Sequence, residues 1–147
     1  MLRTIVAIVA GLVAGSAVNM GLVSLGGLVV PTPQGLDVTD AESIAATSHL
    51  LQPQHFLFPF LAHALGTLIG ALVAYLIAVQ YKQMAAGVVG GVTLAGGIAA
   101  AMMIPAPIWF LVVDLGLAYL PMAWLAIWLG KRLAKHLSGG QQTVSET

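Results

Sequence analysis

Residues 56–79 read FLFPFLAHALGTLIGALVAYLIAV, a run of 24 residues without Asp, Glu, Lys or Arg. About 20 apolar residues in a helix span the hydrocarbon core of a bilayer, because each residue adds roughly 1.5 Å along the axis. The run therefore predicts a transmembrane helix. His63 lies inside it, and an ionisable side chain within a membrane helix is costly, so it calls for a partner or a function.

The composition of the whole chain fits a membrane protein. Of its 147 residues, 59% are hydrophobic and 7% are charged, whereas soluble domains carry about 25% charged residues. We expect an all-α membrane protein, a four-transmembrane-helix bundle forming one domain over residues 1–137, with a disordered cytoplasmic tail at 138–147. Pro121 predicts a bend in the last span. The four predicted spans cover residues 4–29, 56–79, 84–104 and 108–130.

The basic residues predict how the bundle is oriented. All of them fall at the same end of the four predicted spans, namely Arg3, Lys82, Lys131, Arg132 and Lys135. The loop at 31–55 carries Asp37, Asp40 and Glu42 but no Lys or Arg. Because loops rich in Lys and Arg stay in the cytoplasm, both termini are expected to be cytoplasmic. The apolar run at the N-terminus is too long for a signal peptide, so we interpret it as a retained helix, with cleavage as the alternative.

Small residues at helical spacing predict close packing between the spans. Gly11 and Gly15 share one face of the first span with Asn19, because the three recur every four residues. Such glycines let two helices approach closely, although a glycine-rich helix also contains this spacing by chance. The other glycines expected to pack helices are Gly66, Gly70, Gly87 and Gly91.

The loop at 31–55 contains a predicted short helix. Thr39 and Glu42 have the spacing of a capping box, which would open an amphipathic helix running to about Leu51 on the outer surface. His49 and His55 lie at its end, and a metal site is conceivable there because imidazole and carboxylate groups bind metals. Their spacing matches no recognised metal site, so we expect solvated loop residues and no metal.

Polar side chains from three spans are predicted at a similar depth. Helix rise places His63 roughly 10 Å, Asp114 roughly 9 Å and Asn19 roughly 13 Å below the outer helix ends, with Thr67 one turn below His63. A charged Asp at mid-membrane costs about 2.5–3.5 kcal/mol, which predicts a partner. One interpretation is a His63–Asp114 proton relay or cation site, supported by Asn19 and Thr67. The other is an interhelical hydrogen bond that only holds the bundle together.

Several stretches resemble one group of proteins. They are Asn19-Met20-Gly21, Pro31-x-Pro33, residues 55–67 (HFLFPFLAHALGT), Pro105-x-Pro107-x-Trp109-Phe110 and Asp114. Together they cover most of the chain, which resembles small four-span membrane proteins of bacteria that have no assigned activity. The resemblance implies a multi-pass protein of the bacterial cytoplasmic (inner) membrane. It implies no mechanism and no role for any residue.

Two functions remain open on the sequence. The first is a small oligomeric transporter or channel-like protein that uses a proton- or cation-linked pair of His63 and Asp114. The second is a structural or accessory membrane protein that binds partner helices. The expected partners are the lipid bilayer and either further copies of the chain or other membrane helices, because four spans make a thin wall for a cavity.

Other classes of function are disfavoured. The chain has no cysteine, which excludes disulfides, thiol catalysis and iron–sulfur clusters. Its formal net charge is +0, which leaves no basic footprint for nucleic acid. His63 and Asp114 are candidates for acid–base work, but no nucleophile motif or phosphate loop accompanies them, so we expect no enzyme. Haem would require a second histidine at matching depth, and no cofactor is expected.

Overall fold

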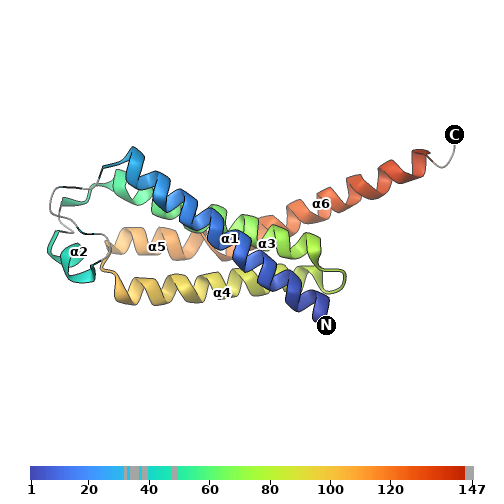
Figure 1. Cartoon of the computed structure of the whole chain (residues 1–147), viewed down its shortest axis with the longest axis horizontal. Coiled ribbons are helices and arrows are strands. Elements are labelled where there is room, and N and C mark those ends of the chain that lie inside the picture. The colour runs from blue at the N-terminus through green and yellow to red at the C-terminus, as the bar shows by residue number, and fades with distance from the viewer. Residues whose placement is uncertain (32, 34–36, 38–39, 48–49, 145–147) are drawn as a thin grey trace.

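The computed structural model describes residues 1–31, 33, 37, 40–47 and 50–144. Every regular element in this part of the chain is a helix (Figure 1). The elements are α1 (Leu2–Val29), α2 (Ala41–Thr47), η2 (Pro53–Phe56), α3 (Leu57–Ile77), α4 (Lys82–Met103), α5 (Ile108–Leu117) and α6 (Leu120–Val144).

Four helical stretches are long and apolar enough to cross a membrane, as the sequence predicts. They are Leu2–Val29, Pro53–Ile77, Lys82–Met103 and Ile108–Lys135. Each has at least 22 residues, which exceeds the roughly 20 needed to cross the hydrocarbon core. Their number, length and composition indicate a multi-pass membrane protein.

The helices run back and forth, so that the two ends of the bundle differ in charge. The N-terminus and the turn between α3 and α4 lie at the same end, and α2 lies at the opposite end (Figure 1). Thr4 links the N-terminal end of α1 to the turn between α3 and α4, because its hydroxyl donates a hydrogen bond to the carbonyl oxygen of Gln80 over 3.5 Å. Arg3 and Lys82 therefore share the end from which α6 leaves the bundle, whereas Asp40 and Glu42 belong to the α2 end.

The short helix of the loop differs from its predicted bounds. α2 ends at Thr47 rather than near Leu51. Its start is capped by Asp40, whose carboxylate accepts hydrogen bonds from the backbone N–H groups of Glu42 at 3.2 Å and Ser43 at 3.1 Å. Asp is a strong N-cap residue for this reason. The predicted cap, Thr39, lies outside the described residues.

The fourth span is broken where Pro121 predicts a bend. α5 ends at Leu117 and α6 begins at Leu120. Pro121 has no N–H to bond the carbonyl four residues earlier, so a continuous helix is disfavoured there. Beyond the span α6 continues to Val144, and the predicted disorder of the tail at 138–147 stays a prediction. Pro121 is the last proline of the chain, so no later residue removes a helical hydrogen bond.

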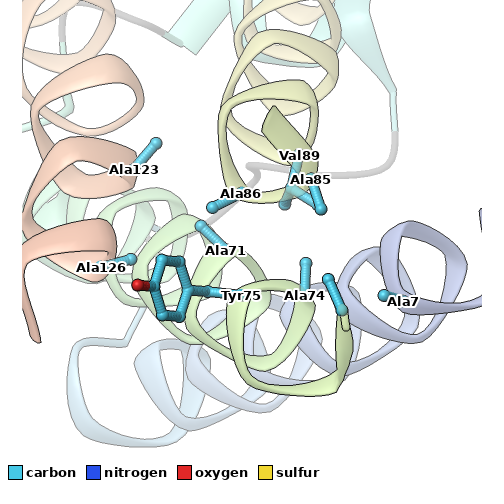
Figure 2. Packing of buried hydrophobic residues seen from close by; sticks show 10 residues of the cluster. Ala7, Ala71, Ala74, Tyr75, Ala85, Ala86, Val89, Ala123 and Ala126 are labelled. Carbon is cyan, nitrogen blue, oxygen red and sulfur yellow. The ribbon is translucent and has the colours of Figure 1, made fainter. Parts of the chain in front are cut away.

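The half of the bundle away from α2 has a dense core of small side chains (Figure 2). α1 and α3 approach there through glycines on both helices. A Cβ added to Gly11 would lie 2.5 Å from the carbonyl oxygen of Gly70, and one added to Gly15 would lie 2.6 Å from that of Gly66. The cluster around this contact consists of Ala7, Ala71, Ala74, Tyr75, Ala78, Ala85, Ala86, Val89, Ala123 and Ala126.

The glycines of α4 behave differently from those of α1 and α3. A Cβ added to Gly87 or Gly91 would meet nothing within 4 Å, so neither packs a helix inside this chain. Gly90 instead lies on the buried face, where an added Cβ would overlap the side chain of Ala123 on α6. If Gly87 and Gly91 pack a helix as predicted, that helix belongs to another chain, and this role stays a prediction.

Candidate functional site

His63 and Asp114 contact each other. Nδ1 of His63 on α3 lies 2.9 Å from both Oδ1 and Oδ2 of Asp114 on α5. The aspartate is 4% exposed, and the histidine side chain is 28% exposed. With the carboxylate ionised, the Nδ1–H group donates the hydrogen bond, and this charge-assisted bond offsets part of the cost of burying a charge.

Tyr119 is a third member of this group that the sequence analysis missed. Its hydroxyl donates a hydrogen bond to Oδ2 of Asp114 over 3.2 Å. Its ring stacks on the His63 imidazole, with centroids 5.7 Å apart and an angle of 29° between the planes. The side chain is 2% exposed. We call His63, Asp114 and Tyr119 the polar triad.

The break in the fourth span explains why Tyr119 reaches Asp114. Residues five apart on an unbroken helix do not share a face, but α5 ends at Leu117, between the two side chains. Gly97 on α4 makes the space, because a Cβ added there would overlap the phenol ring of Tyr119. A tyrosine in an apolar span needs a hydrogen-bond partner for its hydroxyl. This requirement was the feature of the sequence that pointed to Tyr119.

Thr67 does not support the pair as predicted. It is 2% exposed and lies one turn after His63, but its hydroxyl donates to Oγ1 of Thr93 on α4 over 3.3 Å. Thr93 in turn bonds its own helix, donating to the carbonyl oxygens of Val89 and Gly90 at 3.0 Å each. The two threonines therefore link α3 to α4 beside the triad.

Asn19 lies near the triad without a hydrogen bond to it. Its side chain is half-buried against α3, and a Cβ added to Gly66 would lie 3.2 Å from the Cβ of Asn19. Among the described residues its amide has no hydrogen-bond partner. The residue does share a hollow with Thr67 and Thr93, so its predicted supporting role stays a prediction.

Two hollows meet at the triad. The α2-end cavity has a volume of about 380 Å³ and lies among α1, α2, η2, α3, α4 and α5, with His63 and Asp114 in its lining. The crevice has a volume of about 340 Å³ and is lined by Gly15, Ser16, Asn19, Met20, His63, Gly66, Thr67, Thr93, Gly96, Gly97, Ala100 and Tyr119. His63, Gly97 and Ala100 line both hollows, so the imidazole stands where they adjoin.

Of the two histidines in the loop, His55 lies in the described part of the chain. Nδ1 of His55 accepts a hydrogen bond from the backbone N–H of Gln52 at 3.0 Å and so caps η2. His49 lies outside the described residues. Within the described part of the chain, no group of three His, Cys, Asp or Glu side chains is placed to hold a metal ion.

No family model, no curated protein and no solved structure matches this chain. The likeness to small four-span bacterial proteins therefore stays an expectation from the sequence. The triad and the two hollows are the features of this chain that bear on its function.

Proposed function

We propose that this chain is a small proton-linked carrier of the bacterial inner membrane, with both termini in the cytoplasm. The observation that carries the proposal is the position of His63, which bonds a buried carboxylate and lines two hollows at once. Ionisable groups within membrane spans commonly mark proton or substrate pathways. The basic end of the bundle supports the orientation, by the positive-inside rule.

The pair is chemically suited to hold and release a proton. An imidazole and a carboxylate together carry no net charge when they share one proton, whether as an ion pair or as two neutral groups. A second proton makes the pair cationic, and imidazole is the side chain that takes up protons most readily near neutral pH. A substrate that hydrogen-bonds His63 would change the free energy of placing this positive charge in the site. Movement of the substrate would thereby be coupled to the uptake or release of a proton.

The packing favours a carrier over an open pore. On the side of Thr67 away from the triad, the bundle is filled by the small-residue core shown in Figure 2. Ala7, Ala71, Ala74 and Val89 are 0% exposed there. A path from the triad to the basic end therefore requires the helices to separate, as alternating access does.

The alternative is an accessory protein that binds partner helices. The exposed face of α4 favours it, because Gly87 and Gly91 have open space beside them and small residues mark contact faces between membrane helices. The same face would serve the carrier as a contact between copies. The two functions differ in what the triad does.

The test is proton flux into liposomes that contain the purified protein and an entrapped pH-sensitive dye. A potassium diffusion potential drives the flux, first alone and then with an opposing sodium gradient. We expect wild-type protein to admit protons faster than empty liposomes and Asp114→Asn to abolish the difference. Glu42→Gln is the matched control, since it neutralises an exposed carboxylate of α2. Equal rates for wild-type and Asp114→Asn protein would refute the carrier and favour the accessory function.

A further inference from the structure

Both hollows lie in the gap between α1 and α4. The α2-end cavity is bounded by Val23 and Gly26 of α1 and by Ala100 and Ala101 of α4. The crevice continues along the same gap, between Asn19 on one side and Thr93 on the other. Figure 1 shows α1 crossing the bundle obliquely, so that its C-terminal half diverges from α4. The gap therefore widens toward the α2 end.

The mouth of the crevice faces sideways. Ser16, Met20 and Gly96 line it and are exposed. All three lie well inside the helices α1 and α4 rather than at their ends. In a chain whose four long helices cross a membrane, this surface faces the hydrocarbon region. A ligand of this site would therefore enter from the bilayer.

The lining combines an apolar chamber with a short row of hydrogen-bonding groups. The α2-end cavity is formed mostly by apolar side chains, and its volume of about 380 Å³ falls in the usual range for ligand pockets. The polar groups near His63 are the other two members of the triad, Thr67, Thr93 and Asn19, while His55 lies in the lining of the α2-end cavity and Ser16 in that of the crevice. None of the described Lys or Arg residues lines either hollow. A phosphate or sulfate head group would find no permanent cation there.

One nitrogen of the triad, Nε2 of His63, remains available for a hydrogen bond to a ligand. Nδ1 of His63 is engaged by Asp114. Among the described residues Nε2 has no hydrogen-bond partner. The neutral imidazole accepts a hydrogen bond at this nitrogen and the imidazolium donates one. A hydroxyl group suits both states, because it can donate as well as accept, whereas a carbonyl group suits only the imidazolium and a carboxylate would place a second negative charge beside Asp114.

We infer that the two hollows together bind an uncharged, membrane-soluble amphiphile. Its hydroxyl-bearing head bonds His63 and the neighbouring hydroxyl groups, and its alkyl chain occupies the α2-end cavity. This inference names a substrate class for the proposed carrier and rests on that function only for the transport step. Binding is measurable without transport, so the two ideas fail separately.

The experiment is photolabelling of the full chain in nanodiscs. The probe is a monoacylglycerol with a diazirine and an alkyne in its chain, and the reference probe is the same chain without the glycerol head. We expect saturable labelling by the first probe only, competed by unlabelled monoolein and mapped by mass spectrometry to residues 23–30 and 97–104. His63→Gln should weaken the competition about tenfold, the size expected for one hydrogen bond to a chargeable group.

A matched pair of variants tests the place of binding. Ala100→Phe fills both hollows, whereas Ala99→Phe adds the same volume on the exposed face of α4, outside both linings. We expect the first variant to reduce labelling to the level of the headless probe and the second to leave it unchanged. Both residues are at least partly exposed, and a monodisperse elution profile identifies folded protein before labelling.

Three outcomes overturn the inference. Equal, unsaturable labelling by both probes means that bulk lipid alone fills the gap. Equal labelling of the two phenylalanine variants means that the bound head lies elsewhere. Stronger competition by a fatty acid than by monoolein means that the head group is an anion. None of these outcomes contradicts a proton flux that depends on Asp114. The proposed carrier would then have a substrate of another chemical class.

Discussion

Cutting the bond between α3 and α5 should reveal how strongly the buried pair holds the bundle. Asp114→Ala removes a carboxylate that accepts bonds from His63 at 2.9 Å and from Tyr119 at 3.2 Å. A hydrogen bond to a charged group contributes about 1.5–3 kcal/mol in soluble proteins. Interhelical bonds measured in a bilayer protein average about 0.6 and reach about 1.7 kcal/mol. Because this bond is both charge-assisted and buried, we expect a coupling energy of about 1.5 kcal/mol, near the upper value for bilayers.

The assay is a double-mutant cycle. The free energy of unfolding is measured for wild type, His63→Ala, Asp114→Ala and the double variant, by far-ultraviolet circular dichroism in mixed micelles of mild detergent and dodecyl sulfate. The double variant should be less destabilised than the sum of the single variants by about 1.5 kcal/mol, because each single variant already breaks the bond. A control cycle of His63→Ala with Glu42→Ala should be additive to within about 0.5 kcal/mol. A coupling no larger than the control would refute the argument that the pair stabilises the fold.

Further predictions concern neighbouring residues. Tyr119→Phe keeps the ring on His63 but removes one bond to Asp114, and should lower the free energy of unfolding by about 0.5–1.5 kcal/mol in the same assay. Gly90→Ala should cost about 1–3 kcal/mol, because the new methyl group overlaps Ala123, whereas Gly91→Ala should be neutral or slightly stabilising, because it meets nothing. A chain without native cysteine also allows thiol labelling in nanodiscs: we expect Glu42→Cys, at an exposed position of α2, to react with a maleimide and Ala71→Cys, at a fully buried position, to stay unmodified.

The sequence alone was sufficient to predict the features that depend on composition and helix rise. The four spans follow from apolar length, and the shared depth of His63 and Asp114 follows from counting residues at roughly 1.5 Å each. The break near residue 118 follows from the chemistry of Pro121. These features are local, because each depends on residues within one helix or on the distance to its end.

Features that depend on how helices rotate against each other were not predictable in this way. Gly87, Gly90 and Gly91 all fit a small-residue pattern, and only the docking of α6 decides that Gly90 is the one covered. The partner of Thr67 is Thr93 rather than His63 for the same reason. Tyr119 was missed because its contact with Asp114 requires the helix break to redirect the side chain.

One packing choice produces both the closed half of the bundle and the open site. Gly11 and Gly15 of α1 press against Gly66 and Gly70 of α3 so closely that an added methyl group would overlap backbone. α1 stays against α3 toward the α2 end, because a Cβ added to Gly26 would overlap the side chain of Phe58. Because α1 follows α3 in this way, its C-terminal half diverges from α4, which leaves the gap that exposes His63 between α1 and α4. A larger residue at Gly15 should therefore alter the width of the site as well as the stability of the fold, without touching the triad.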